Sequence, residues 1–216
     1  MGMVARRAYD EGCPATHALD LVGERWALLV VRELLFGPKR FTDLDDRLAG
    51  VSTSVLSQRL QELAGAGVLV RRKLPPPAGS WVYELTDWGH RLEPLIMALG
   101  QWGIQSPQFD CEAPVTPASM ALALKGFANP ARVENLTGLV ELEFDGEVFH
   151  AFPEDGRLLV TGATGGHPDA RIIASPGRLW PFLRGLAATS NNLRNNGIQT
   201  EGDRKTAVAL LAAMGT

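Results

Sequence analysis

The chain has 216 residues, a formal net charge of −3 and a hydrophobic content of 45%. This length fits two modest domains, and the hydrophobic content supports packed cores. The charge excludes a generally basic protein that coats nucleic acid, so any DNA contact must come from local patches. Residues 1–105 carry 12 Lys and Arg against 12 Asp and Glu, and residues 106–216 carry 9 against 12. The acidic excess therefore lies in the second half.

No apolar run approaches the roughly 20 residues that span a bilayer, and the opening MGMVARRAYDEG lacks the apolar core of a signal peptide. We therefore expect a cytoplasmic protein without membrane insertion. Its two cysteines, Cys13 and Cys111, lie far apart without CxxC spacing, and its four histidines form no ligand pattern around them. The sequence predicts no metal site, no disulfide framework and no cofactor.

Residues 14–36 have a helical period that is interrupted at Gly23, which predicts two helices that meet near this glycine. The dipeptide Gly37-Pro38 ends the second helix. A short helix follows, with Thr42 as its expected cap and acidic residues in its first turn. This short helix is the expected first half of a helix-turn-helix.

The stretch from Ser52 to Val68 predicts a helix with one apolar and one polar face, capped at its start by Ser52. The polar face is expected to carry hydroxyls, amides and Arg59, with no carboxylate before Glu62. Such groups reach phosphates and base edges in a major groove. A merely solvated face, the alternative, would normally mix in Glu and Lys. We interpret this helix as the readout helix of a helix-turn-helix.

Two strands are predicted next, over residues 68–74 and 81–85, with the loop PPPAGS between them. Together they form a two-stranded wing that carries three consecutive basic residues, Arg71 to Lys73. These residues could be a solvated edge that discourages strand pairing. Directly after a readout helix, a contact with DNA phosphates is the favoured interpretation.

A helix capped by Thr86 and kinked at Pro94 is predicted after the wing. It bears an apolar stripe that a bare winged fold cannot cover, so a second copy of the chain is its expected cover. The stripe residues expected at this homodimer interface are Leu92, Leu95, Ile96, Leu99 and Trp102.

Residues 13–103 resemble the HxlR family of bacterial winged helix-turn-helix transcriptional regulators. The matching pieces are CPATHALDLVGERWALLVVREL, GPKRFTDL, VSTSVLSQRLQELAGAGVL and YELTDWGHRLEPLIMALGQWG, in family order and spacing. The resemblance implies dimeric, sequence-specific binding to double-stranded operator DNA, and we expect a repressor. The DNA-binding residues are expected to be Lys39, Arg40, Ser52, Thr53, Ser54, Ser57, Gln58, Arg59, Arg71, Arg72 and Lys73.

Cys13 stands just before Pro14, at the expected start of the first helix. Some members of this family use a cysteine in this element as a redox switch, and a helix N-terminus favours the thiolate. The alternative is an inert thiol, because no basic residue adjoins Cys13 and two acidic residues lie nearby in sequence.

The second half begins after a polar, proline-bearing segment at residues 105–116. A helix from Pro117 is followed by two alternating runs, residues 139–144 and 147–152, joined by Asp145-Gly146. An Asp-Gly between such runs predicts a two-residue hairpin. This register pairs Leu142 with Phe149, Val140 with Ala151, and Glu141 with His150. We interpret the last pair as a cross-strand polar contact and not as an acid-base site.

Three more strands and two more helices complete an expected α+β domain with one antiparallel sheet covered by helices. Strands are expected at 157–161, 171–174 and 198–201. A helix is expected after Ser175-Pro176, with Ser175 as its cap, and another at 202–214.

This half resembles the sterol carrier protein type of lipid-binding domain over about residues 117–214, in SPGRLWPFLRGL and NNGIQTEGDRKTAVALLAAM. The resemblance implies a cavity between sheet and helices for a small hydrophobic effector, and the alternative is a solid core. The ligand-binding residues expected from it are Phe149, Trp180, Phe182 and Leu183.

The sequence therefore predicts a winged helix-turn-helix domain (1–104), a linker (105–116) and a sterol carrier protein-like domain (117–216). We expect a dimeric transcriptional regulator whose second domain senses a ligand. The alternative is a winged module for dimerisation and protein docking that carries a lipid-binding domain and does not bind DNA. An enzyme is not expected, because no nucleophile-base pair, phosphate loop or metal cluster appears.

Overall fold

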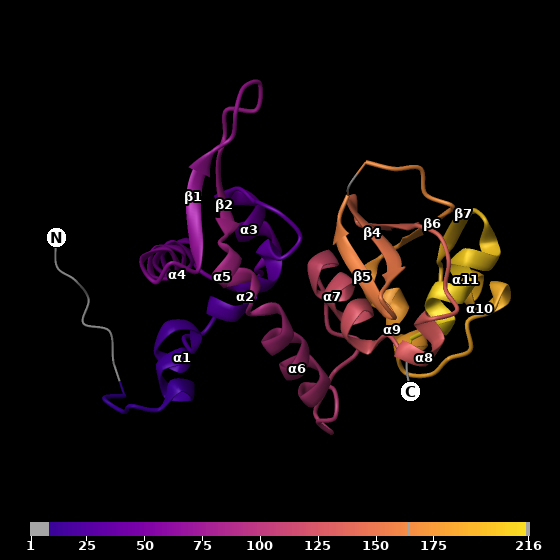
Figure 1. Cartoon of the computed structure of the whole chain (residues 1–216), viewed down its shortest axis with the longest axis horizontal. Helices are drawn as coiled ribbons and strands as arrows, with labels where there is room; N and C mark the ends of the chain where they lie inside the picture. The colour runs from indigo at the N-terminus through magenta and orange to yellow at the C-terminus, as the bar shows by residue number, and fades with distance from the viewer. Residues whose placement is uncertain (1–8, 164, 215–216) are drawn as a thin grey trace. The chain divides into compact units, whose positions relative to one another are not determined.

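A computed structural model describes residues 9–163 and 165–214 of the chain. Residues 1–8, on which the expectation about a signal peptide partly rests, lie outside this part. The chain divides into two compact units, Met1–Ile96 and Met97–Thr216 (Figure 1). Within the described residues, every helix is too short or too polar to cross a lipid bilayer.

The first unit is a winged helix-turn-helix. Its elements in chain order are α1 (Pro14–Val22), α2 (Ala27–Leu34), α3 (Phe41–Arg47), α4 (Thr53–Gly65), β1 (Leu69–Lys73), β2 (Trp81–Leu85) and α5 (Asp87–His90), followed by α6 (Glu93–Gly103), which crosses the unit boundary. The antiparallel hairpin β1–β2 projects from the helices as the wing (Figure 1). The predicted break between the first two helices is confirmed, and Trp26, the N-cap residue of α2, has a φ of 79°.

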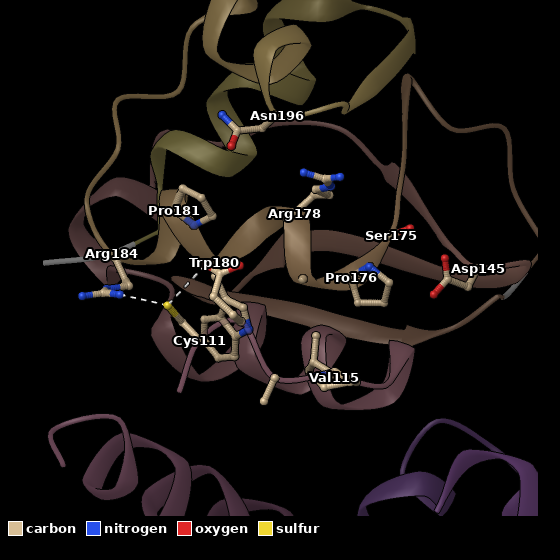
Figure 2. A pocket seen from close by; sticks show the side chains of 14 residues that line it. Cys111, Val115, Asp145, Ser175, Pro176, Arg178, Trp180, Pro181, Arg184 and Asn196 are labelled. Carbon is tan, nitrogen blue, oxygen red and sulfur yellow. Dashed lines mark hydrogen bonds between the residues drawn. The ribbon is translucent and has the colours of Figure 1, made fainter. Parts of the chain in front are cut away.

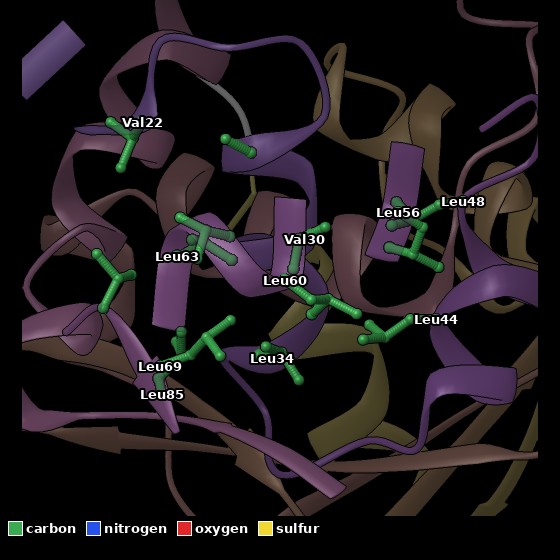
Figure 3. Packing of buried hydrophobic residues seen from close by; sticks show 13 residues of the cluster. Val22, Val30, Leu34, Leu44, Leu48, Leu56, Leu60, Leu63, Leu69 and Leu85 are labelled. Atoms are coloured by element: carbon green, nitrogen blue, oxygen red, sulfur yellow. The ribbon is translucent and has the colours of Figure 1, made fainter. Parts of the chain in front are cut away.

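Leucines and valines from α2, α3 and α4 form the core of this unit (Figure 3). Leu56, Leu60 and Leu63 of α4 are at most 1% exposed, as is Leu34 of α2. Burying each such side chain stabilises the fold by roughly 1.5 to 3 kcal/mol. The apolar side of α4 is therefore fixed against α2, which leaves its other side to solvent.

Two local predictions in this unit are wrong. Thr42 does not cap α3, because the helix begins two residues earlier than such a cap requires: its N-cap is Arg40, whose N–H donates to the Asp43 carboxylate at 2.8 Å. The predicted helix from Thr86 is divided into α5 and α6. Thr86 does cap α5, accepting a bond from the Gly89 N–H at 3.0 Å. Pro94 is the second residue of α6, where its missing N–H is tolerated, but a proline there cannot donate the backbone hydrogen bond that would continue α5 into α6.

The second unit is an α+β fold around a five-stranded sheet. Its helices are α7 (Pro117–Phe127), α8 (Pro130–Val133), the 3-10 helix η1 (Pro176–Leu179), α9 (Trp180–Leu183), α10 (Ser190–Asn195) and α11 (Arg204–Ala212). Its strands are β3 (Val140–Phe144), β4 (Glu147–Glu154), β5 (Arg157–Gly162), β6 (Ala170–Ala174) and β7 (Gln199–Gly202). The short α10 has no counterpart among the predicted elements.

The hairpin prediction is confirmed in position and register. Val140 pairs with Ala151 and Leu142 with Phe149. Asp145 has a φ of 48° and Gly146 a φ of 81°, the left-handed geometry that a two-residue turn requires.

The sheet is mixed, so the prediction of an antiparallel sheet is wrong. Its strand order is β5-β4-β3-β6-β7, and β6 runs parallel to β3. The connection from β5 to β6 crosses β4 and β3, and β5 and β6 both run in the direction of β3. Ser175 also fails as a side-chain cap, because the chain enters η1 without a cap bond from its hydroxyl.

Candidate nucleic-acid interface

The solvent side of α4 carries small polar side chains. Ser52, Thr53 and Ser54 are exposed, and Ser57 and Gln58 are half-buried. The Ser52 hydroxyl caps the helix by accepting a bond from the Val55 N–H at 3.4 Å. We call these five residues, 52–54, 57 and 58, the α4 face. Hydroxyls and an amide at the N-terminal end of the second helix of a helix-turn-helix are the groups that contact base edges and phosphates in this fold.

Arg59 does not belong to the α4 face, and the expectation that it lies on the exposed side is wrong. It is only 8% exposed. Its Nη1 lies 2.5 Å from Glu62 Oε2 and 3.6 Å from Glu24 Oε2. On a 100° helical projection Arg59 falls close to Leu63, on the core side, and its long stem packs there while the guanidinium reaches two carboxylates. Arg59 therefore ties α4 to the turn between α1 and α2.

The three basic residues of the wing differ in their surroundings. Arg71 is exposed, with its guanidinium 4.7 Å from the centre of the Trp81 ring. Arg72 is half-buried and forms a two-point ion pair with Glu84. Lys73 is exposed. The Arg72 guanidinium holds the pKa of Glu84 below its usual range through this hydrogen bond. Arg71 and Lys73 thus offer their charge to an anion more freely than Arg72 does.

The segment before α3 lies against the wing. Lys39 and Tyr83 of β2 exchange backbone hydrogen bonds at 3.0 and 2.8 Å. This bridge brings Lys39 and the exposed Arg40 beside the wing, and α4 packs against β1. The structure therefore gathers the α4 face, the wing and Lys39-Arg40 within one compact unit. Whether each residue touches DNA stays a prediction.

The predicted dimer residues lie on both sides of the unit boundary. Leu92 and Ile96 are partly buried and pack against the core of the first unit. Leu95, Leu99 and Trp102 are 43%, 46% and 77% exposed. The exposed members form a stripe along α6 whose role as a dimer interface stays a prediction.

Cys13 is the N-cap residue of α1. Hydrogen bonds from the Thr16 backbone and side chain and from the Ala15 backbone lower the pKa of its thiol. The thiolate, which is the reactive form, is thereby favoured. This geometry is compatible with the redox prediction, which remains untested.

In the second unit, the predicted ligand residues separate into two groups. Phe149, Phe182 and Leu183 are buried in the core, with Phe149 against Phe144 at a ring separation of 6.0 Å. Trp180 is half-buried and lines a cavity of about 700 Å³ whose walls include none of the other three. Sequence reasoning missed the other polar residues of this cavity, because they come from separate segments and share no periodic pattern.

The predicted Glu141 and His150 pair is confirmed as a cross-strand contact, with Nε2 and Oε2 3.5 Å apart. Its surroundings were not predicted. Arg171 of β6 pairs with Glu141 at 2.8 Å and Glu143 at 2.5 Å, and its Nη1 lies 3.5 Å from Glu201. We call these five residues the polar face of the sheet. Their charges are largely satisfied by one another, which favours a structural role.

Comparison with known proteins agrees with the fold of the first unit. Residues 21–109 match the HxlR-like helix-turn-helix family. The uncharacterized HTH-type transcriptional regulator YvaP of Bacillus subtilis is 36% identical over 97 residues, which are 44% of this chain and 90% of YvaP. The uncharacterized HTH-type regulator sll1512 of Synechocystis is 36% identical over 91 residues, 42% of this chain and 67% of that protein.

Among solved structures, the reduced form of the transcriptional regulator YodB from B. subtilis is 30% identical, with a TM-score of 0.41. The match covers 45% of this chain and 97% of the YodB chain.

The first unit, with its paired α3 and α4 and its two-stranded wing, defines a winged helix-turn-helix DNA-binding protein. The chain belongs to the HxlR-like helix-turn-helix family of transcriptional regulators. It is a DNA-binding regulator, and the family match accounts for its first half only.

Proposed function

We propose that the chain represses transcription in the bacterial cytoplasm by binding operator DNA as a homodimer. The α4 face carries the proposal, because it presents exposed hydroxyls together with the Gln58 amide, whose Nε2 donates to the half-buried Glu62 carboxylate at 2.9 Å. In this proposal the α4 face enters the major groove, and the wing with Lys39 and Arg40 contacts phosphates. Arg59 holds α4 in place through its ion pairs with Glu24 and Glu62.

Loss of a base contact changes which DNA sequence is preferred, whereas loss of a phosphate contact weakens binding to every sequence. This difference gives a test. Gln58→Ala should change the preferred sequence and cost about 1 to 3 kcal/mol on the best site. Lys73→Ala should weaken binding to all sequences and reduce the salt slope by about one. Affinity is measured against salt on a selected operator and on random DNA.

Gln199→Ala is the control, because Gln199 is an exposed glutamine of β7, in the other unit. It should leave affinity and preference unchanged. Identical slopes and preferences for Gln58→Ala and Lys73→Ala would remove the assignment of base and phosphate contacts.

The homodimer is proposed on the exposed stripe of α6. Leu99→Glu would bury an unpaired charge in a dimer interface, at a cost of several kcal/mol. Sedimentation should then show a folded monomer. Leu186→Glu, which changes another partly exposed leucine outside the stripe, should remain dimeric. A dimer of unchanged strength for Leu99→Glu would place the interface elsewhere.

For the second half we propose a sterol carrier protein-like effector domain at residues 117–216, joined by the linker 105–116 to the DNA-binding domain at 1–104. The observation in favour is a sheet with one buried apolar face, on which α7 and α11 pack. An effector should shift operator affinity by about 1 to 3 kcal/mol. Titration of operator with and without apolar compounds measures this shift.

A further inference from the structure

The cavity beside Trp180 differs from the apolar pocket that the sequence predicts. Its volume of about 700 Å³ is that of a small-molecule site. Figure 2 shows its walls, which come from the linker, the β3–β4 turn, η1 and α9. Both polar and apolar residues line it, and two of them, Arg178 and Arg184, stand on either side of Trp180 in the chain.

The two arginines retain their charge for an external partner. Within residues 9–163 and 165–214, neither guanidinium forms an ion pair with a carboxylate. The Arg184 Nη1 donates instead to the Cys111 Sγ at 3.1 Å. Of the carboxylates that line the cavity, Asp145 lies at the end opposite Arg184 in Figure 2. Glu112 adjoins Cys111, with its Oε1 3.9 Å from the thiol. The cavity therefore suits one anionic group near the arginines and not several.

The wall between the arginines is aromatic and held in place. The Phe109 ring meets the Trp180 ring edge to face, with centroids 5.4 Å apart and an angle of 77°. A fixed indole offers a flat surface on which another planar ring stacks. Pro176 and Pro181 add rigid apolar surface beside it.

We infer that this cavity binds a small aromatic carboxylate, with its ring against Trp180 and its acid group on Arg178 or Arg184. Guanidinium groups match the geometry of a carboxylate and bind it in a bidentate manner. The inference deepens the proposed effector sensing, on which it rests, and replaces a purely apolar ligand with an acidic one.

One wall of the cavity is the segment that leads to the DNA-binding domain. Cys111, Pro114 and Val115 lie between α6 and α7 and line the site directly. A ligand that prefers one arrangement of this segment shifts its population toward that arrangement. The site thus places a bound acid in contact with the covalent connection between the two halves.

The two cysteines of the chain give a site-specific test on the full-length protein without DNA. Cys111 lines the cavity, and Cys13 lies in the other unit. The probe is 1-naphthoate, and the reagent is iodoacetamide, with alkylation followed for each cysteine peptide by mass spectrometry. Saturating naphthoate should slow alkylation of Cys111 by about tenfold or more and leave Cys13 unchanged, because an occupied cavity excludes the reagent from its walls.

The neutral isostere 1-naphthamide and one arginine variant separate charge from shape. Naphthamide should protect at least tenfold less well at equal concentration. Arg178→Gln should raise the Kd for naphthoate, measured by calorimetry, by about tenfold, the effect of losing one charged hydrogen bond. Arg157→Gln is the control, because Arg157 is exposed on β5 and does not line the cavity.

Equal protection by naphthamide would overturn the acidic class, and protection of both cysteines would show non-specific binding and overturn the site. No protection by naphthoate at millimolar concentration would also overturn it. Since these measurements contain no DNA, such a failure leaves the salt-slope test of operator binding unaffected, and a failure of that test leaves the cavity unaffected.

Discussion

The wing and the polar face of the sheet both carry charged side chains on paired strands, but they differ in where those charges find partners. On the wing, Arg71 lies over an indole ring and Lys73 is exposed. On the sheet, one arginine is enclosed by three carboxylates: Arg171 pairs with Glu141, Glu143 and Glu201. A charged surface binds an external partner where the protein itself leaves the charge unneutralised, so the wing is the candidate site and the sheet face is not.

Arg59 gives the strongest test of this difference, because it lies in the DNA-binding unit but pairs with carboxylates of the protein itself. Arg59→Gln removes the cation from Glu24 and Glu62, and should lower the free energy of unfolding by roughly 1 to 2 kcal/mol, since the buried arginine loses its packing while the two carboxylates left behind are accessible to solvent. The preferred DNA sequence should stay the same. Urea unfolding and operator selection measure the two effects.

Arg71→Gln is the control for Arg59, because its exposed side chain should affect stability by no more than about 0.5 kcal/mol. A changed sequence preference with unchanged stability in Arg59→Gln would instead show that Arg59 contacts bases directly.

A smaller effect is expected on the sheet. Arg171→Gln leaves three carboxylates close together, but the arginine side chain is 36% exposed, so solvent screens much of the repulsion. The free energy of unfolding should fall by less than in Arg59→Gln, with operator affinity unchanged. Loss of operator affinity in this variant would contradict the division of roles between the wing and the sheet.

The smallest effect concerns Arg72, which lies on the wing but, like Arg171 of the sheet, is paired with a carboxylate. Glu84→Gln should free the Arg72 charge, strengthen binding to all DNA sequences a few fold and raise the salt slope by up to about one. The Arg72 guanidinium lowers the pKa of Glu84, so the pair is charged at neutral pH. Its contribution to stability is lost only as the pH falls through that lowered pKa. Unchanged DNA binding by Glu84→Gln would show that Arg72 does not face phosphates.

The local parts of this fold could be predicted from the sequence because each depends on neighbouring residues. Ser52 and Thr116 both cap the helices expected after them, and Asp145-Gly146 turns the predicted hairpin. The parallel pairing of β6 with β3 could not be predicted, since it depends on which strands meet after a long connection. Strand order is a non-local property that alternation alone does not encode.

The candidate sites show the same limit. Helical period and residue type predict the α4 face. They also assign Arg59 to it because arginine is charged, although its position in the helix, one turn before the buried Leu63, places it on the core side. The cavity joins Cys111, Asp145 and Arg178 from segments far apart in the chain. Only the fold brings those side chains together, so the sequence indicated Trp180 without its polar neighbours.

The contact between the end of α4 and the start of α5 affects which spacing of DNA half-sites a dimer can bind. The Thr86 hydroxyl donates to the Gly67 carbonyl at 2.8 Å and also caps α5, so one side chain holds the end of the recognition helix to the start of the next. A Cβ atom at Gly89 would lie 2.0 Å from the Val68 carbonyl oxygen, so the backbones of the two segments are in close contact at this point. In the proposed dimer, the separation of the two recognition helices is therefore set by a rigid joint in each subunit, and the regulator should tolerate little variation in the spacing of operator half-sites.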